Sequence, residues 1–174
     1  MVEMVVESVR VSLTTQNRVV ILKDKTTERY LLIWIGPLEA WAIASAVAGV
    51  PPARPSTHDL VKSVVDEIGA KVTQIVVNDL REETFFARII MDINGRHVEI
   101  DSRPSDAIAV AVRVKAPIYV EETVLNSAGV TPDTEELPAQ ESQPAEKLDL
   151  EKLSAFKDLI NGLDTLDDLG KPKS

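Results

Sequence analysis

The stretch PLEAWAIA at residues 37–44 decides the fold, because its pattern returns 67 positions later as PSDAIAVA at residues 104–111. Each copy reads Pro, any residue, an acid, Ala, any residue, Ala, Ile or Val, and Ala, and each follows a strand-like run that begins with an arginine. A pattern repeated at such a period indicates one supersecondary unit used twice. We therefore predict an internal duplication, with two similar strand–strand–helix units at about residues 1–69 and 70–130.

The runs around the two copies predict an α+β fold, with mixed and mainly antiparallel sheets and Ala-rich helices. Alternating or Val-rich segments are typical of strands, and a Pro at the start with a Gly after the end is typical of helices. Asn94-Gly95 predicts a two-residue hairpin turn, and residues 79–83 indicate another turn. The predicted strands are 2–13, 18–24, 29–35, 71–78, 85–93, 96–101 and 118–120, and the predicted helices are 37–49, 57–68, 104–115 and 121–128.

The composition changes after residue 130. Residues 131–146 are rich in Pro, Glu, Gln and Ser, which is typical of a disordered linker. Residues 147–174 combine acidic residues with Leu, Phe and Ile at helical spacing, which predicts one amphipathic tail helix that docks on the folded part or on a partner. We therefore expect one domain at residues 1–130, followed by a linker and an acidic tail.

The formal charge is −9, divided into −3 for residues 1–130 and −6 for residues 131–174. Neither part has the basic excess by which proteins bind nucleic acid tightly, so only a few local phosphate contacts are expected. The absence of Cys excludes disulfides, thiolate metal sites and cysteine nucleophiles. No apolar run approaches the roughly 18–20 residues that span a bilayer, and the N-terminus lacks the basic region of a signal peptide. We therefore expect no membrane association and a cytoplasmic location.

Glu39 and Asp106 are the acids that the two copies share. Both stand at the third helical position, where a carboxylate binds free backbone N–H groups and opposes the helix dipole, so capping alone accounts for them. Asp106 differs in its neighbours. Strand alternation places His97, Glu99 and Asp101 on one face of the preceding strand, whereas the matching positions of the first copy are apolar.

Two interpretations of this polar strand face stay open. A strand with one solvated face is common in antiparallel sheets. Alternatively, Asp101 and Glu99 join Asp106 across the strand–helix turn and bind a divalent cation. Oxygen ligands of this kind suit Mg²⁺ or Mn²⁺.

Residues 57–60, THDL, place His58 in the first turn of a predicted helix. The helix dipole disfavours imidazolium there, so a neutral His58 could act as a general base, bind a metal or simply form a local hydrogen bond. Asp59 is its acidic neighbour. Arg54 and Arg103 are candidates for phosphate binding because the guanidinium fork matches phosphate oxygens, although Arg103 could equally pair with nearby acids.

Three segments of the chain resemble the bifunctional nuclease family of bacteria and plants: IWIGPLEA at 33–40, RPSTHDL at 54–60 and DSRPSDAIA at 101–109. The resemblance covers about residues 1–130. It implies a nuclease of broad specificity that hydrolyses phosphodiester bonds of RNA and DNA. It also implies a homo-oligomer, for which we expect a dimer.

Side-chain chemistry suggests roles within these segments. We predict catalytic residues His58 and Asp59, phosphate-binding residues Arg103 and Arg54, and a Mg²⁺ or Mn²⁺ site made by Asp101, Asp106 and Glu99. Two other functions stay open. One is a non-enzymatic regulatory or scaffolding protein that assembles through its Ala-rich helices, and the other is a small-molecule binder that uses the cleft between the two units.

Overall fold

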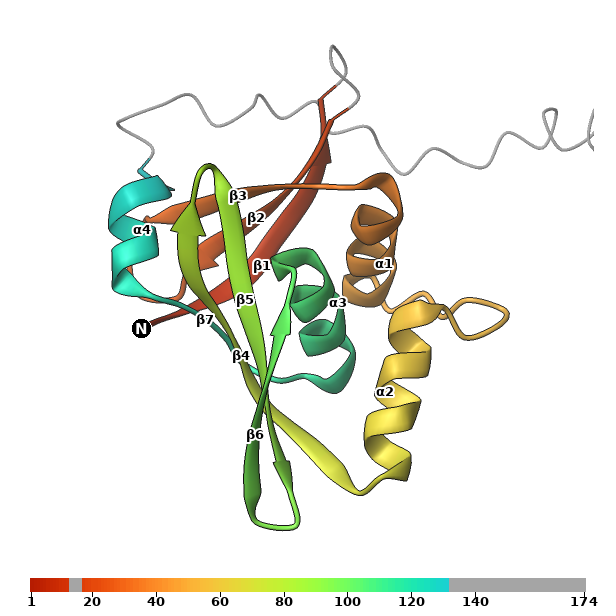
Figure 1. Cartoon of the computed structure of the whole chain (residues 1–174). Helices are drawn as coiled ribbons and strands as arrows, with labels where there is room; N and C mark the ends of the chain where they lie inside the picture. Colours follow the sequence, from red (N-terminus) through yellow and green to blue (C-terminus); the bar gives the residue numbers. More distant parts are fainter. Residues whose placement is uncertain (13–16, 132–174) are drawn as a thin grey trace, which may run out of the picture. The chain divides into compact units, whose positions relative to one another are not determined.

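The computed structural model of the chain describes residues 1–12 and 17–131. The predicted linker beyond Thr131 and the predicted tail helix lie outside the described residues. Within the described part, eight strands form one mixed sheet in the order β6-β5-β4-β7-β1-β2-β3-β8, and four helices accompany it (Figure 1). The predicted α+β fold is confirmed.

The strands are β1 (Val2–Val11), β2 (Arg18–Asp24), β3 (Tyr30–Ile35), β4 (Ala70–Arg81), β5 (Thr84–Ile93), β6 (Arg96–Ser102), β7 (Ile118–Val120) and β8 (Gly129–Val130). The helices are α1 (Pro37–Val47), α2 (Thr57–Glu67), α3 (Pro104–Val114) and α4 (Glu122–Ala128). Each element except β8 was predicted from the sequence to within a few residues. A strand of two residues carries too little periodicity to be recognised.

Two antiparallel three-stranded meanders lie on either side of β7. The first is β1-β2-β3 and leads into α1, whereas the second is β4-β5-β6 and leads into α3. The short strand β7 joins them, antiparallel to β1 and parallel to β4. This order of elements is the one that the repeated motif requires, while the common origin of the two units stays a prediction.

The turns of the second meander show how local sequence sets strand register. Asn94 and Gly95 have φ angles of 53° and 82°, so they form the predicted two-residue connection between β5 and β6. The predicted turn at residues 79–83 is shorter than expected. Strand β4 continues to Arg81, and Glu82 and Glu83 alone make the turn, with φ of 46° and 60°. Pairing with β5 stabilises the extra strand residues.

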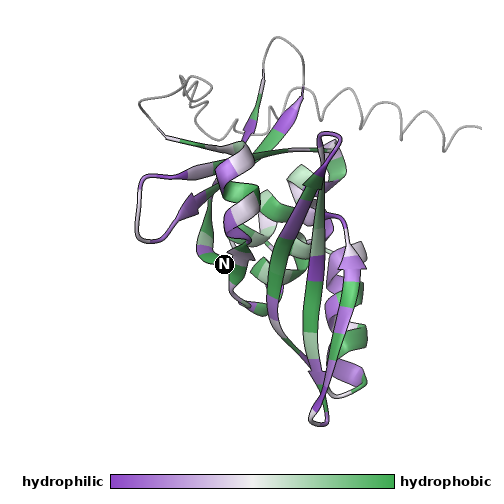
Figure 2. Cartoon of the chain, turned by 60° about the vertical axis from the view of Figure 1, so that its left-hand side comes forward, coloured by the Kyte–Doolittle hydropathy of each residue, from purple (hydrophilic) through white to green (hydrophobic). Residues whose placement is uncertain are grey.

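The hydrophobic core lies between the sheet and the helices. Helix α3 packs against β3, β4 and β5, and both α1 and α2 pack against α3. Its three alanines are buried together with Ile108 and Val110, and their small size lets the neighbouring helices approach closely. Figure 2 shows apolar and polar residues alternating along the long strands, as expected of strands with one face on the core.

In the described residues, no helix is long and apolar enough to cross a membrane.

Candidate active site at three helix starts

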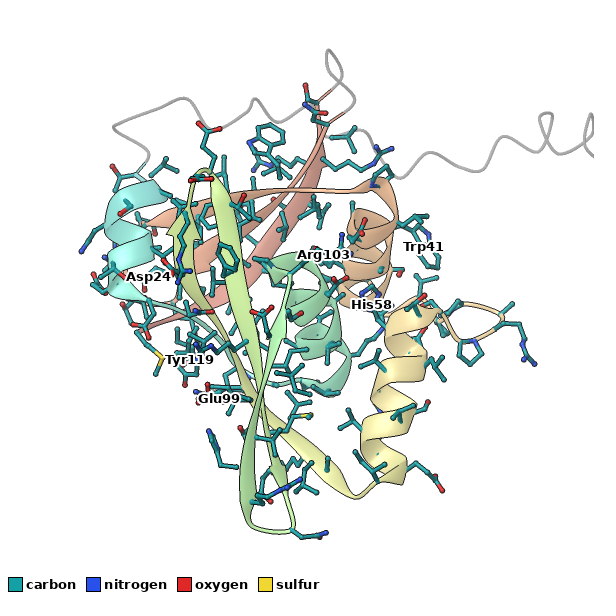
Figure 3. All side chains as sticks on the ribbon, in the orientation of Figure 1. Asp24, Trp41, His58, Glu99, Arg103 and Tyr119 are labelled. Carbon is teal, nitrogen blue, oxygen red and sulfur yellow. The ribbon has the colours of Figure 1, made fainter. Side chains whose placement is uncertain are left out.

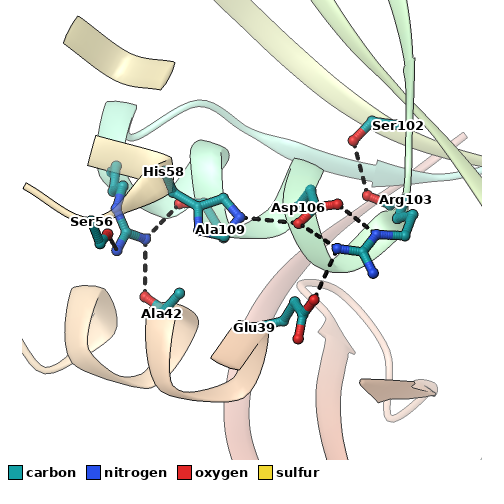
Figure 4. A network of polar contacts seen from close by, with 9 residues as sticks. Glu39, Ala42, Ser56, His58, Ser102, Arg103, Asp106 and Ala109 are labelled. Atoms are coloured by element: carbon teal, nitrogen blue, oxygen red, sulfur yellow. Dashed lines mark hydrogen bonds and ion pairs between the residues drawn. The ribbon is translucent and has the colours of Figure 1, made fainter. Parts of the chain in front are cut away.

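The helices α1, α2 and α3 share one feature in their first turns. Each has an acidic residue at the third helical position: Glu39 in α1, Asp59 in α2 and Asp106 in α3. Pro occupies the first position of α1 and of α3 and has no backbone N–H, so each of these helix starts has one donor fewer to satisfy. Arg103 binds Glu39 and Asp106, and Arg113 binds Asp59. Figure 4 shows the contacts of Arg103 with Glu39 and Asp106.

Arg103, the N-cap residue of α3, holds two of the carboxylates together. Its Nε donates to Asp106 Oδ2 at 2.7 Å, and its Nη2 donates to Glu39 Oε1 at 2.9 Å and to Asp106 Oδ1 at 3.2 Å. His58 completes the cluster, because its Nε2 lies 3.1 Å from Asp106 Oδ1. The result is a Glu39–Arg103–Asp106–His58 chain that spans the first turns of α1, α2 and α3.

Arg103 is the most exposed member of the cluster, and Asp106 is 30% exposed. The Arg103 side chain is 68% exposed, whereas that of Glu39 is 18% and that of His58 is 12% exposed. Within the described residues, Nη1 of Arg103 makes no hydrogen bond, so one face of the guanidinium can receive a ligand. Figure 3 shows Arg103 and His58 near the start of α3.

The surroundings of Asp106 favour its charged carboxylate form. Partial burial opposes its ionisation, but hydrogen bonds from Arg103 and His58 outweigh that effect and lower the pKa of Asp106 below its ordinary value. The hydrogen bond to Asp106 in turn raises the pKa of the Arg103 guanidinium. With His58 neutral, the four side chains carry a formal charge of −1, from two carboxylates and one guanidinium.

A second arginine fixes the helix that carries His58. Arg113 is almost fully buried, with 6% of its side chain exposed, and its Nε donates to Asp59 Oδ1 at 2.7 Å. Its Nη1 donates to the carbonyl oxygens of Ala42 in α1 and Ala109 in α3, both at 2.9 Å. The Arg113 side chain therefore connects α1, α2 and α3 by hydrogen bonds, and it does so at the residue next to His58.

Asp59 is part of this support. Its Oδ2 accepts from the backbone N–H of Ser56 at 2.8 Å and from the Ser56 hydroxyl at 2.6 Å, which makes a capping box at the start of α2. These bonds from Ser56, assisted by Arg113 and opposed by burial, lower the pKa of Asp59 to about 2. Both carboxylate oxygens are occupied, so the geometry gives Asp59 a structural part: it orients the turn that carries His58.

Comparison with known proteins decides the family. The sequence pattern of the bifunctional nuclease domain matches residues 20–133, which include every residue of the network. The chain belongs to this family.

The relatives of this bifunctional nuclease domain fall into two groups. An uncharacterized protein of Mycobacterium tuberculosis is 40% identical over 161 residues, which cover 91% of the chain and 94% of that protein. Bifunctional nuclease 2 of Oryza sativa subsp. japonica is 31% identical over 118 residues, or 66% of the chain and 36% of the plant protein. Bifunctional nuclease 1 of Arabidopsis thaliana is 32% identical over 115 residues, or 64% and 35%. The plant nucleases are therefore much longer than the matched domain.

The remaining predicted site residues of this nuclease domain lie elsewhere. Glu99 is on the exposed face of the edge strand β6 and pairs with Arg88 of β5 at 2.7 Å. Asp101 is also exposed, opposite Arg88 in the strand register. Arg54 is exposed in the connection between α1 and α2 and makes no hydrogen bond or ion pair within the described ranges. Among the residues that the structure describes, no three His, Asp or Glu side chains are grouped as metal ligands.

Two members of the network were not predicted as site residues. Glu39 was interpreted as a helix cap, yet it reaches across to Arg103, 64 positions away. Arg113 was not singled out at all. A signal was present, because Arg113 is the lone cation in an otherwise Ala- and Val-rich helix, and a charged side chain on a buried helix requires a partner.

Proposed function

We propose that this domain is a nuclease that hydrolyses phosphodiester bonds at the Glu39–Arg103–Asp106–His58 cluster. The observation that carries the proposal is the pairing of His58 with a charged Asp106, beside an arginine that is exposed to solvent. The family match supports the reaction class, because relatives that match about two thirds of the chain are named nucleases.

In this proposal His58 is the general base. Asp106 accepts the hydrogen bond from Nε2–H, a tautomer assigned from this contact, so Nδ1 carries the lone pair. Nδ1 accepts a proton from the water molecule that attacks phosphorus, while Asp106 stabilises the imidazolium that forms. The P–O ester bond breaks as the water oxygen bonds to phosphorus, and the leaving alkoxide takes its proton from solvent water. Arg103 binds a non-bridging phosphate oxygen through Nη1, since its Nε and Nη2 are held by Asp106 and Glu39.

Glu39 and Asp59 are supporting residues in the mechanism. Glu39 holds Nη2 of Arg103 and so fixes the direction of the guanidinium. Asp59 and Arg113 fix the first turn of α2, and with it the position of His58. A correctly placed base and phosphate ligand contribute through orientation, which can supply several kcal/mol of rate enhancement.

Dependence on Mg²⁺ or Mn²⁺ is part of the same proposal. Glu39 would offer the cation its Oε2, which makes no hydrogen bond among the described residues, and Asp106 would exchange its bond with Arg103 Nη2 for the cation. The net charge of −1 favours a cation there. Two carboxylates fit Mg²⁺, which commonly takes its other ligands from water and substrate phosphate. When bound, such a cation neutralises charge that develops on the phosphate. Binding of the cation by Asp101 and Glu99 is the alternative that the sequence predicts, and an Asp101→Asn variant distinguishes it from the site at Asp106 and Glu39.

Purified protein assayed on single-stranded and double-stranded RNA and DNA tests this function. His58→Gln should lower the rate at least about 100-fold, the usual loss for a general base. His97→Gln is the matched control, because His97 is the chain's other histidine and is exposed on β6. It should cleave at the parental rate. EDTA should abolish cleavage, and Mn²⁺ should restore it.

Equal cleavage by the parent and His58→Gln proteins would contradict the proposal, because a contaminating nuclease is unaffected by the mutation. RNA and DNA cleaved at similar rates would support broad specificity.

A further inference from the structure

Gly36, the N-cap residue of α1, has ordinary backbone geometry. Its φ and ψ angles are −72° and 163°, which any residue can adopt. Ser56 and Arg103, the N-cap residues of α2 and α3, have nearly the same backbone, with φ of −76° and −67°. The backbone therefore does not require a glycine at position 36.

Capping of α1 does not require this glycine either. Ser, Thr, Asp and Asn are the residues whose side chains bind free N–H groups at a helix start, and Gly has no side chain to offer. Helix α1 accordingly has no hydrogen bond from an N-cap side chain. A Ser at position 36 would cap α1 at least as well, so the reason for a glycine lies elsewhere.

The space beside the Cα atom of Gly36 is what distinguishes this N-cap residue. A Cβ atom added there would lie 2.3 Å from Oε2 of Glu39 and 3.2 Å from its Cδ. Both distances are shorter than the roughly 3.5–4.0 Å at which non-bonded atoms pack favourably. The Glu39 carboxylate thus occupies the volume that a side chain at position 36 would need.

In this place the two oxygens of Glu39 have different surroundings. Oε1 accepts a hydrogen bond from Nη2 of Arg103 at 2.9 Å, a contact that Figure 4 shows. Oε2 lies against Gly36 and makes no hydrogen bond among the described residues. The free oxygen is the one that the proposed cation site would use, so the position of Glu39 beside Gly36 bears on both functions of the carboxylate.

Helix α2 shows the alternative arrangement. Its N-cap residue, Ser56, has a Cβ atom, and its acid at the third helical position, Asp59, is one methylene group shorter than Glu. The Asp59 carboxylate folds back onto Ser56, whose backbone N–H and hydroxyl donate to it at 2.8 Å and 2.6 Å. In α1 the longer Glu39 lies over Gly36 and extends to Arg103 of the second unit.

We propose that Gly36 is a positioning residue of the reaction centre. Because it has no side chain, the Glu39 carboxylate can lie beside its Cα atom, where it binds Arg103 and leaves Oε2 free. A Cβ atom at position 36 displaces Glu39, since the end of a flexible side chain moves more easily than the backbone. The catalytic consequence rests on the proposed function, whereas the contact between positions 36 and 39 can be tested without activity.

Binding of Mn²⁺ alone to the full chain tests the effect on the cation site. Electron paramagnetic resonance measures the free Mn²⁺ in a titration, so no substrate is needed. Gly36→Ala should weaken Mn²⁺ binding about 10-fold, the lower end of the loss seen when a residue that orients a metal ligand is changed. Leu38→Ala is the matched control, because Leu38 is in the same helical turn and is 80% exposed. It should bind Mn²⁺ as the parent does.

A double-mutant cycle separates positioning of Glu39 from a general effect on the helix start. In a Glu39→Ala background, Gly36→Ala should raise the melting temperature by about 1–4 °C, because Ala restricts the unfolded chain and meets no carboxylate. In the parent the same substitution should give no gain or a loss, because its Cβ atom displaces Glu39. Gly36→Ala should also change the Mn²⁺ affinity of the Glu39→Ala protein by less than about 2-fold, since both substitutions remove the same contact.

Equal shifts in melting temperature in the two backgrounds would overturn the proposal, and so would parental Mn²⁺ affinity in the Gly36→Ala protein. A parent that binds no Mn²⁺ would contradict the cation site of the proposed function. A shift in melting temperature that depends on Glu39 would in that case still support Gly36 as the residue that positions this carboxylate.

Discussion

Two units with the same order of elements have opposite surroundings. In the first unit the strand β3 is mostly buried and the helix α1 exposes one whole apolar face. In the second unit the strand β6 is an exposed polar edge and the helix α3 is buried nearly throughout. One motif thus gives a surface helix and a core helix. The difference teaches that position in the layer, rather than the motif, decides what each copy does.

The acids of the motif show the same division. Glu39 and Asp106 occupy equivalent helical positions, and a single arginine from the second unit binds both. Only Asp106 also contacts His58, because α2 packs against α3. The reaction centre that we propose therefore depends on where a third helix lies, which the repeat itself does not encode.

The largest effect on stability is expected from removing the arginine that only the second unit has. Arg113→Met should lower the free energy of unfolding by about 3–5 kcal/mol, because it leaves Asp59 without its charged partner and frees two buried carbonyl oxygens. Arg88→Met is the control, since Arg88 is half-exposed and its pair with Glu99 lies on the surface. It should change stability by less than about 1 kcal/mol. Similar losses in urea unfolding of the two variants would contradict the role of Arg113.

A second pair of variants compares equivalent positions of the two helices. Ala111 is fully buried in α3, and Ala44 is its exposed counterpart in α1. Ala111→Leu should destabilise the protein by about 1–3 kcal/mol through overpacking. Ala44→Leu should stay within about 0.5 kcal/mol, as expected at the surface. Thermal unfolding measures both stabilities. A larger loss of stability for Ala44→Leu than for Ala111→Leu would contradict the assignment of α3 as the buried helix and α1 as the surface helix.

Low pH should destabilise the start of α2, where Asp59 orients the turn that carries His58. The pKa of Asp59 in the folded protein is about 2, below its ordinary value of 3.8, so its charge stabilises the fold above about pH 4. This stabilisation, on the order of 2 kcal/mol, should be lost as the pH falls from about 4 toward 2. Asp59→Asn should be less stable at neutral pH and should show a flatter decline over this range. Parallel curves from urea unfolding at each pH would contradict the assignment.

The smallest effect on stability is expected at Glu39. Glu39→Gln keeps the shape of the side chain but loses the charged pair with Arg103, which is exposed, so stability should fall by less than about 1 kcal/mol. The cleavage reaction should respond more, with a higher Mn²⁺ concentration needed for half-maximal rate. An unchanged Mn²⁺ dependence would remove Glu39 from the proposed cation site.

Much of the fold could be predicted because the local signals agree with it. Alternation, the Asn94-Gly95 turn and the Pro and Gly residues at helix ends all act over a few residues. The repeated motif also led to Asp106, the acid that lies beside His58 in the structure. What the sequence could not provide was the contact of His58 with Asp106 and of Glu39 with Arg103. These pairs are 48 and 64 positions apart, and they form only because helix packing brings the helix starts together.

The polar face of β6 shows the opposite case. Alternation placed His97, Glu99 and Asp101 on one face, and the structure exposes all three. Alternation defines a face but not what lies opposite it. Here the edge position of β6 leaves that face to solvent and to Arg88. Only the packing of the sheet edge distinguishes a solvated face from a binding site.

The most direct measurement compares phosphodiester cleavage by Asp106→Asn and Asp101→Asn, prepared identically with the parent protein. Asp101 lies near the end of β6 and Asp106 in the first turn of α3, but only Asp106 contacts His58 and Arg103. We expect Asp106→Asn to lose at least about 100-fold in kcat/KM and Asp101→Asn to lose less than about 3-fold, a difference of more than 2 kcal/mol in transition-state stabilisation. An Asp106→Asn protein that folds normally and cleaves as fast as the parent, or a large loss confined to Asp101→Asn, would contradict a reaction centre at the three helix starts.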